Sequence, residues 1–428
     1  MPAPELKGRK VTVAGLARSG VAAARLCARE GARVTVTDRR AAADLAAPLE
    51  ALEGAAARLA LGGHDRADFE GADLVVVSPG VPMAIPEIAA ARARGVPVWG
   101  EVELGARFLD GAPVVAVTGT NGKSTTTALA GALVARDRPT FTGGNLGTPL
   151  CEHVLSGAHA DAVVLELSSF QIEGIVRLRP RVAAILNVTP DHLDRYRDVD
   201  DYALAKARLF GLQQAGDAAV ANARDERAVA MASASRGELW TFGFGPPAPG
   251  SARDPGGDDA PASGTELWIS PRAGAPERYV LRNRALRGRH NRENAMASAL
   301  CARLLGVGGD AVQGGLDAFP GLPHRLELVS GSRGVEWVND SKATNVDSTA
   351  VGLSAFAAGA PRVVLIMGGR GKGAPYAPLR PLFAGRVKAL LTIGEDAPRI
   401  EAELGDLCPT EGCGALAEAV KRASRIAV

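Results

Sequence analysis

Short apolar runs rich in β-branched residues alternate along the chain with segments whose apolar positions recur at helical spacing. In the first hundred residues five such runs lie at 10–16, 32–38, 57–63, 73–80 and 96–100, with Gly, Asp or Ser-Pro signals at their ends. Alternation of this kind predicts parallel strands connected by helices, and therefore a sheet whose faces are covered by helices.

The alternation restarts after Pro113 with the run VVAVT. Further runs at 162–169 and 182–188 are apolar enough for buried parallel strands. Residues 245–264 are rich in Pro, Gly and Asp, which predicts a flexible surface insertion, and ELWTFGF, ELWIS and ERYVLRN around it read as more exposed strands.

A third restart follows GLPHRLE, with strand-like runs at 335–340, 362–369 and 387–394 and a helical segment, ALAEAVKRASRIAV, at the end. Because a strand ordinarily follows such a helix, we expect the third sheet to lack its final strand. The restarts predict three α/β domains, at 1–105, 106–321 and 322–428.

Composition places the chain among globular proteins, since 46% of its 428 residues are apolar and 22% are charged. A net charge of +2 gives no reason to expect nucleic acid or a membrane surface as partner. The five cysteines form no C-x-x-C pair, which favours free thiols in a reducing compartment over structural zinc. Neither a signal peptide nor a membrane-spanning run is apparent, so we expect a cytoplasmic protein.

The stretch VVAVTGTNGKSTTTALA resembles a phosphate-binding loop between a strand and a helix. Gly119 and Gly122 allow backbone N–H groups to converge on an anion, Lys123 supplies a positive charge, and Ser124 supplies a hydroxyl for Mg²⁺. The following helix adds its positive N-terminal end. The strict Walker pattern has glycine where this chain has Val117.

The first strand-to-helix turn, GLARSG, has Gly15 and Gly20 at the outer positions of G-x-G-x-x-G but Ala17 at the middle one. Asp38 closes the second strand, where dinucleotide-binding folds place an acid for ribose. The turn suits a nucleotide-like ligand better than NAD, although tight strand-to-helix packing alone would also explain it.

Polar residues interrupt or follow the apolar runs of the central region. Glu166 lies in LELSSFQ, and Asp191, His192 and Asp194 lie in NVTPDHLDRY, so all should meet at the carboxyl edge of a parallel sheet. A buried carboxylate needs a partner or a metal, whereas His192 alone could be an ordinary loop histidine. Lys206 shares a predicted helix face with two aromatics, either as a snorkelling side chain or as a modified lysine at a metal site.

The last third of the chain carries further candidates. Five arginines between 282 and 292 lack interleaved aromatics, which favours a solvated or phosphate-facing segment over a nucleic-acid patch. Polar residues at helix or domain starts, or just after strands, are Asn291, Arg325, Asp340, Lys342, Thr344 and Lys372.

Taken together, GTNGKST, LELSSFQ, NVTPDHLDRY, GRHNRENA, GLPHRLE and NDSKATN resemble the Mur ligase family, in family order and across nearly all of the chain. That family uses GTNGK[ST] in place of the strict Walker pattern, so Val117 is no defect. The resemblance implies a dinucleotide-binding-like domain for the UDP substrate, a central P-loop ATPase-like domain, and a C-terminal Rossmann-like domain. HLDRY, and GLPHR with NDSKATN, favour the reaction in which ATP activates UDP-MurNAc-L-Ala as an acyl phosphate and D-glutamate attacks it.

The resemblance also implies residue roles. ATP would be held by Gly119, Thr120, Asn121, Gly122, Lys123, Ser124, Thr125, Asn291, Arg325 and Asp340. Of two Mg²⁺ ions, one would bind Ser124 and Glu166, and the other His192 and a Lys206 carbamylated by CO₂. The UDP substrate would contact Leu16, Arg18, Ser19, Asp38, Arg39, Gly80, Asn145 and His192. D-Glutamate would be held by Lys342, Thr344 and Lys372, and Lys123, Glu166, His192, Lys206 and Lys342 would serve catalysis.

Other functions remain open from the sequence. One is a sister ligase with another amino acid, and another is a folylpolyglutamate synthetase, which the N-terminal domain disfavours. Family members end with a further strand and a segment that encloses D-glutamate; nothing comparable follows Val428, so a non-catalytic UDP-precursor or nucleotide-binding protein is an alternative. A nicotinamide oxidoreductase would leave the second loop unexplained. We expect a monomer.

Overall fold

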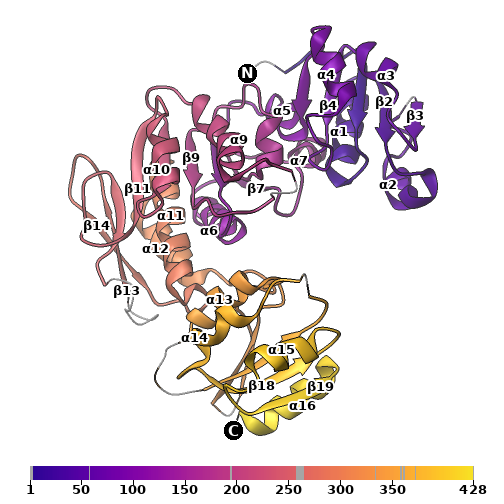
Figure 1. The fold of residues 1–428 in the computed structure, drawn as a ribbon. Helices are drawn as coiled ribbons and strands as arrows, with labels where there is room; N and C mark the ends of the chain where they lie inside the picture. Colours follow the sequence, from indigo (N-terminus) through magenta and orange to yellow (C-terminus); the bar gives the residue numbers. More distant parts are fainter. Residues whose placement is uncertain are drawn as a thin grey trace. The chain divides into compact units, whose positions relative to one another are not determined.

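The computed structural model describes residues 3–427 apart from 57, 193–194, 257–264, 333, 357–358, 360–361 and 372 (Figure 1). The chain divides into two compact units, which are described separately. The first comprises 1–253, 268–278 and 294–315, and the second 254–267, 279–293 and 316–428. In the described part of the chain no helix has the length and apolar character needed to cross a bilayer.

The first sheet has the strand order β3-β2-β1-β4-β5, and every pair is parallel. Its elements are β1 (Lys10–Ala14), α1 (Arg18–Arg29), β2 (Arg33–Asp38), η1 (Ala42–Leu45), α2 (Ala46–Ala51), β3 (Arg58–Leu61), α3 (Arg66–Glu70), β4 (Leu74–Val77), α4 (Pro86–Ala93), β5 (Val98–Gly100) and α5 (Glu101–Ala106). The five predicted strands are confirmed, and the order is that of dinucleotide-binding folds. Gly15 at φ +91° makes the turn from β1 to α1.

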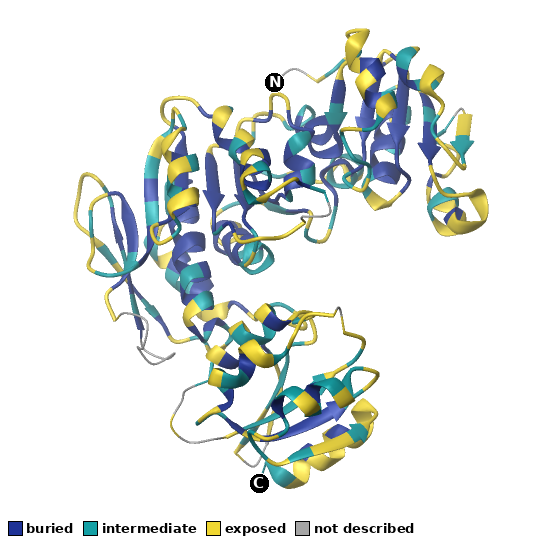
Figure 2. Cartoon of the chain, in the orientation of Figure 1, coloured by how far each residue is buried: buried dark blue, intermediate teal, exposed yellow. Residues whose placement is uncertain are grey.

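The central sheet has the order β14-β13-β12-β11-β10-β9-β6-β8-β7. Its strands are β6 (Val114–Thr118), β7 (Thr140–Gly144), β8 (Ala162–Glu166), β9 (Val182–Ile185), β10 (Ala218–Asn222), β11 (Glu238–Phe244), β12 (Ser251–Asp254), β13 (Thr265–Ser270) and β14 (Glu277–Leu281). From β7 to β11 neighbouring strands run parallel. All residues of β6, β8 and β9 are buried, and all are apolar except Thr118 and Glu166; the strand labelled β9 in Figure 1 has the colour of buried residues in Figure 2. Continuous apolar runs therefore marked these strands correctly.

The helices of this region are α6 (Lys123–Ala135), α7 (Leu150–Ser156), α8 (Ser169–Glu173), α9 (Val199–Gly211), α10 (Glu226–Ser233), η2 (Arg284–Leu286), α11 (Arg289–Leu304) and α12 (Gly309–Ala318). The flexible insertion predicted at 245–264 is wrong for Ser251–Asp254, which form β12 and pair antiparallel with β13. Asp254 there accepts a hydrogen bond from the buried guanidinium of Arg292, a partner that local composition does not reveal. Residues 257–264 lie outside the described residues.

Besides η2 and the start of α11, up to residue 293, the second unit contains a hairpin and a parallel sheet. The hairpin pairs β15 (Glu327–Ser332) with β16 (Val335–Asn339), and the sheet order is β17-β18-β19. The remaining elements are α13 (Val346–Ser354), β17 (Val363–Gly368), η3 (Ala377–Leu379), α14 (Arg380–Phe383), β18 (Val387–Ile393), α15 (Ala397–Leu404), β19 (Thr410–Gly414) and α16 (Leu416–Ile426). The three predicted strands and the terminal helix are confirmed, and the α/β class holds in both units.

Candidate active site

The P-loop begins where β6 ends. Val117 is a fully buried residue of this strand, Gly119 and Gly122 have φ of +147° and +84°, and α6 starts at Lys123. An L-amino acid with a side chain rarely adopts these two backbone φ values, so the turn favours glycine at both positions. The glycines that shape this cradle are thus Gly119 and Gly122, and Val117 is part of the strand.

Lys123 lies over the loop that precedes it. Its Nζ donates to the carbonyl oxygens of Gly119 at 3.0 Å and of Thr120 at 2.8 Å. Next to it, Ser124 and Thr125 belong to the first turn of α6, where backbone N–H groups have no intrahelical acceptor. A positive side chain above a helix N-terminus forms an anion site.

Glu166 ends β8, in register with Val117 on β6. Its side chain is buried, and Oε1 accepts a 2.6 Å hydrogen bond from Nδ2 of Asn145. Oε2 is buried without a hydrogen-bond partner among the described residues. A buried carboxylate oxygen left in this state is costly, so Glu166 has unused capacity to accept a ligand.

Lys206 reaches the same loop from α9. It is 1% exposed, its Nζ donates to Gly119 O at 3.1 Å, and it lies 4.3 Å from the centre of the Tyr202 ring. Burial, with the neighbouring charge of Lys123, lowers the pKa of the Lys206 amine to about 7. The snorkelling alternative is wrong, because the amine does not reach solvent.

His192 follows β9 in a strained conformation with φ +54°. Its N–H donates to Oδ1 of Asp191, and its ring lies 4.9 Å from the Phe170 ring and 6.0 Å from that of Tyr202. His192 and Lys206 therefore both contact Tyr202. Asp194 lies outside the described residues.

The turn of the first sheet is organised by Asp38. Its Oδ2 accepts from the backbone N–H of Leu16 at 2.7 Å, and Arg40 donates to both carboxylate oxygens. Burial opposes ionisation, but these hydrogen bonds lower the pKa of Asp38 to about 2. The sequence singled out Arg39, which is exposed, whereas Arg40 is the residue that pairs with Asp38.

The other predicted UDP contacts lie near this turn or toward the central sheet. Arg18 donates to Gly147 O at 2.7 Å and pairs with Glu152. Asn145, predicted to contact the sugar region, donates its amide to Glu166 at 2.6 Å. Ser19 is half-buried and Gly80 is exposed, with open space where a Cβ would lie.

In the second unit, GLPHRLE and NDSKATN come together. Asp340 Oδ1 accepts from Leu326 N at 3.1 Å, and Lys342 N donates to His324 O at 3.1 Å. His324 and Leu326 have positive φ. Burial raises the pKa of Asp340, against the effects of the Leu326 N–H group and the charge of Arg325.

Of the remaining predicted residues, Thr344 donates its N–H to Lys342 O at 2.9 Å, and Asn291 is buried in α11. Lys372 lies outside the described residues. The predicted candidates with described contacts therefore include a group around Asp38 and a group around Gly119 in the first unit, and a group around Asp340 in the second.

Sequence reasoning assigned no site role to two asparagines, one bonded to the P-loop and the other to the helix that follows it. Asn187 hydrogen-bonds to Thr120 and Asn121, and Asn294 Oδ1 accepts from the Thr126 hydroxyl at 3.1 Å. Asn187 comes directly after a buried strand and before the PDHLDRY segment, which is the signal that could have identified it.

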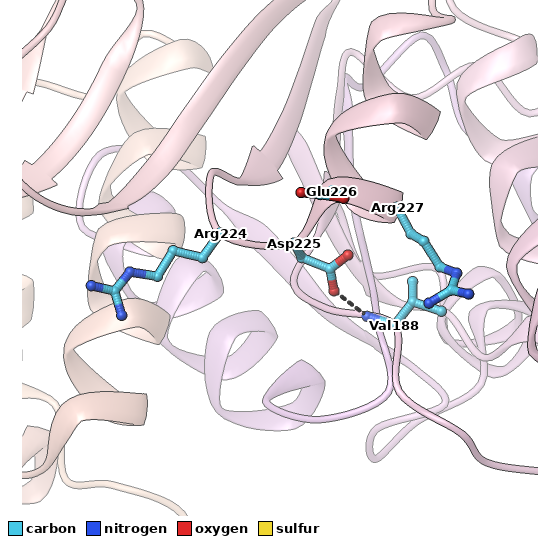
Figure 3. Close-up of a pocket in the computed structure, with 5 residues that line it drawn as sticks. All are labelled: Val188, Arg224, Asp225, Glu226 and Arg227. Carbon is cyan, nitrogen blue, oxygen red and sulfur yellow. Dashed lines mark hydrogen bonds between the residues drawn. The ribbon is translucent and has the colours of Figure 1, made fainter.

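A surface hollow of about 560 Å³ lies at the carboxyl end of β10 (Figure 3). It is lined by Val188, Arg224, Asp225, Glu226 and Arg227, none of which the sequence singled out. Asp225 Oδ2 accepts from Val188 N at 2.7 Å, so this hollow borders the segment that leads to His192.

The described residues contain no group of three or more His, Cys, Asp or Glu side chains placed to hold a metal ion. Near the P-loop the protein offers two oxygen ligands, the Ser124 hydroxyl and the unpartnered Oε2 of Glu166, among the described residues. These are oxygen ligands of the kind Mg²⁺ takes when nucleotide phosphates supply the rest of its coordination. The residues thus fit a phosphate-bound Mg²⁺.

Three family models together match most of the chain. They are the Mur ligase MurD-like N-terminal domain at 9–100, the Mur ligase middle domain at 117–302 and the Mur ligase glutamate ligase domain at 324–428. The chain belongs to the Mur ligase family. This family uses ATP and Mg²⁺, and its three-domain architecture is the one predicted from the sequence.

Similar proteins extend this assignment. The UDP-N-acetylmuramoylalanine–D-glutamate ligase of Anaeromyxobacter dehalogenans is 76% identical over 99% of this chain and 91% of its own length. The ligase of the same name from Myxococcus xanthus is 52% identical over 99% and 91%. Among solved structures, MurF from Acinetobacter baumannii matches 97% of this Mur ligase and 86% of its own chain with a TM-score of 0.60 and 18% identity, which supports the fold.

Proposed function

We propose that this Mur ligase joins D-glutamate to UDP-N-acetylmuramoyl-L-alanine, with ATP cleaved to ADP and phosphate, in the synthesis of peptidoglycan. One observation carries the proposal: the side-chain amines of Lys123 and Lys206 both donate to the carbonyl oxygen of the P-loop residue Gly119. This site lies in a chain that is 76% identical to a D-glutamate ligase. A sister ligase with another amino acid is not favoured, because the relatives at 76% and 52% identity carry the D-glutamate name.

The chemistry begins with a poor electrophile. A carboxylate at neutral pH resists attack, and transfer of the γ-phosphoryl group to its oxygen creates an acyl phosphate. The amine of D-glutamate then attacks the carbonyl carbon, a proton leaves the nitrogen, and the C–O bond to phosphate breaks to give the amide. Phosphoryl transfer needs positioning and charge neutralisation above all, which Lys123 and the N–H groups of Ser124 and Thr125 are placed to provide.

We assign one Mg²⁺ to Ser124 and Glu166 and a second to His192 and a carbamylated Lys206. When bound, the ions supply neutralisation of phosphate charge. An amine with a pKa of about 7 is substantially neutral at physiological pH, and only the neutral form reacts with CO₂. That reaction forms an N–C bond and releases a proton, so a buried neutral amine becomes an anionic oxygen ligand.

The remaining assignments follow the family pattern. The Asp38 turn, with Leu16, Arg18, Ser19, Arg39 and Gly80, receives the UDP end of the substrate, and Asn145 lies toward its sugar. Asn291, Arg325 and Asp340 serve ATP, Lys342 approaches the transferred phosphate, and Thr344 and Lys372 hold D-glutamate. The cytoplasmic location, the monomeric state and the domain boundaries stay predictions.

Phosphate release tests the proposal directly. We expect release from ATP only when UDP-MurNAc-L-Ala and D-glutamate are both present, with L-alanine, L-lysine, meso-diaminopimelate and L-glutamate inactive in the same assay. Release with a different amino acid would identify a sister ligase. Binding of the UDP substrate without release under any combination would favour a binding protein.

A further inference from the structure

Asn187, two residues after the end of β9, is hydrogen-bonded to the P-loop. Its carboxamide Oδ1 accepts from Thr120 N at 3.1 Å and Asn121 N at 2.8 Å, and its Nδ2 donates to Asn121 O at 3.1 Å. Its backbone carbonyl accepts from Thr120 N at 3.0 Å. One residue thus satisfies both the N–H and the C=O side of the loop between the two glycines.

The two residues after Asn187 continue this connection. Val188 N donates to Asp225, while Thr189 exchanges two hydrogen bonds with the Thr120 hydroxyl, at 3.0 and 3.1 Å. Three residues beyond Thr189 comes His192, held at φ +54°. The segment 187–189 therefore joins the P-loop to the backbone that carries His192.

We propose that Asn187 is a positioning residue for phosphoryl transfer, whose carboxamide holds Thr120 and Asn121 in place relative to the His192 segment. The inference rests on the proposed function. Because protein groups already satisfy the N–H groups of Thr120 and Asn121, this half of the loop keeps its shape without a ligand. The phosphates are then bound by the rest of the loop and the first turn of α6. Because the loop is already in place, it does not have to rearrange when negative charge develops on the transferred phosphoryl group in the transition state.

The chain offers a matched control in Asn222. It ends β10, beside β9, and is also an asparagine at the carboxyl edge of the sheet, but its Oδ1 accepts from Arg224 N. Asn187→Ala should lower kcat by about tenfold to a hundredfold, since small displacements of catalytic groups have effects of this size. The KM values for UDP-MurNAc-L-Ala and D-glutamate should stay within about twofold of wild type. Asn222→Ala should leave kcat unchanged.

Asn187→Asp distinguishes positioning from a general role in stability. Aspartate keeps the acceptor for Thr120 N and Asn121 N but loses the donor to Asn121 O, so its kcat should lie between those of wild type and Asn187→Ala. A purely structural role predicts instead that both variants lose thermal stability while kcat per folded molecule stays at the wild-type value. That result would overturn the proposal.

Calorimetric titration with ADP separates this proposal from the proposed reaction, because it requires no turnover. We expect Asn187→Ala to weaken ADP binding by about fivefold or more, and Asn222→Ala to leave it unchanged, because the Ala variant loses the three carboxamide hydrogen bonds that pre-form the loop. Wild-type ADP affinity in Asn187→Ala would contradict the positioning role. If wild type released no phosphate with its substrates, the proposed function would fail while this arm still decided the role of Asn187.

Discussion

Two buried carboxylates in the first unit have opposite surroundings. Glu103, on α5, is fully buried, and its Oε2 accepts three backbone N–H bonds, from Val176 at 2.9 Å and from Arg177 and Leu178 at 3.0 Å. Its Oε1 pairs with Arg107 at 2.8 Å. Glu166 is buried as well, but it has one amide donor on Oε1 and no partner on Oε2 among the described residues.

The difference separates a carboxylate whose partners all come from the protein from one that is proposed to bind Mg²⁺. Glu103 fixes α5 to the segment after α8, and its charge is compensated within the protein. An unpartnered oxygen alone is not sufficient for a site, since Glu101 on the same helix also has one. The position of the carboxylate distinguishes the two residues. Glu166 ends a strand beside the strand that leads into the P-loop, whereas Glu101 accepts a hydrogen bond from Cys151 N on α7.

The largest effect should come from Lys206, the buried amine that shares Gly119 with the P-loop lysine. Lys206→Ala should reduce turnover by about 10³-fold or more, because a ligand to a catalytic metal contributes several kcal/mol. Small carboxylates such as acetate should restore part of the rate by supplying the missing oxygen ligand. A Lys206→Ala variant with a normal rate would show that the carbamate role is wrong.

Glu166→Gln should reduce kcat by about 10²- to 10³-fold, since the carboxamide keeps the shape but loses the charge that a metal needs. The free energy of unfolding should stay equal or increase, because an uncompensated buried charge is removed. Urea unfolding and phosphate release on the same preparation measure both quantities. A Glu166→Gln variant that lost stability but kept its rate would show that Glu166, like Glu103, stabilises the fold and does not bind a metal.

Glu103→Gln should show the reverse pattern. We expect a loss of about 3 kcal/mol in the free energy of unfolding, as found when one partner of a buried ion pair is removed. The kcat per folded molecule should stay within about threefold of wild type, because the hydrogen-bond partners of Glu103 in the described part of the chain, Arg107 and the backbone of 176–178, are not predicted site residues. A large loss of kcat without a change in the urea midpoint would break the comparison.

Glu101 gives the smallest effect and the one that depends on pH. Burial raises the pKa of Glu101 to about 7, so the folded state binds more protons than the unfolded state between the ordinary glutamate range and pH 7. Wild-type stability from this group is present at low pH and is lost as pH rises through 7. Glu101→Gln should therefore be more stable than wild type by roughly 1–3 kcal/mol at pH 8, and the gain should vanish near pH 4. An equal gain at both pH values would contradict the assignment.

The sequence predicted the buried strands because continuous apolar runs between turn signals are local features. The sequence analysis did not predict β7, β10 and β19, because their sequences TFTGG, AAVAN and TEGCG are short and rich in Gly or Ala. β12 escaped because its composition is that of a loop, and its order comes from Arg292, which lies 38 residues away.

The site divides in the same way. The P-loop, Glu166 and His192 were predictable because each follows a strand in a recognisable motif. The burial of Lys206 and the pairing of Asp38 with Arg40, which the sequence did not predict, depend on tertiary packing. Asn187 is the first residue of the NVTPDHLDRY motif, but its contact with the P-loop could be inferred only from the pairing of β9 with β6.

A titration of phosphate release with Mg²⁺ tests the contrast between the two carboxylates most directly. Wild type, Glu166→Gln and Glu103→Gln would be compared at fixed ATP, UDP-MurNAc-L-Ala and D-glutamate. We predict that Glu166→Gln raises the Mg²⁺ concentration for half-maximal rate by about tenfold or more, as losses at a metal site do, while Glu103→Gln leaves it unchanged. The same Mg²⁺ dependence in all three proteins would contradict the assignment of Glu166 to a metal.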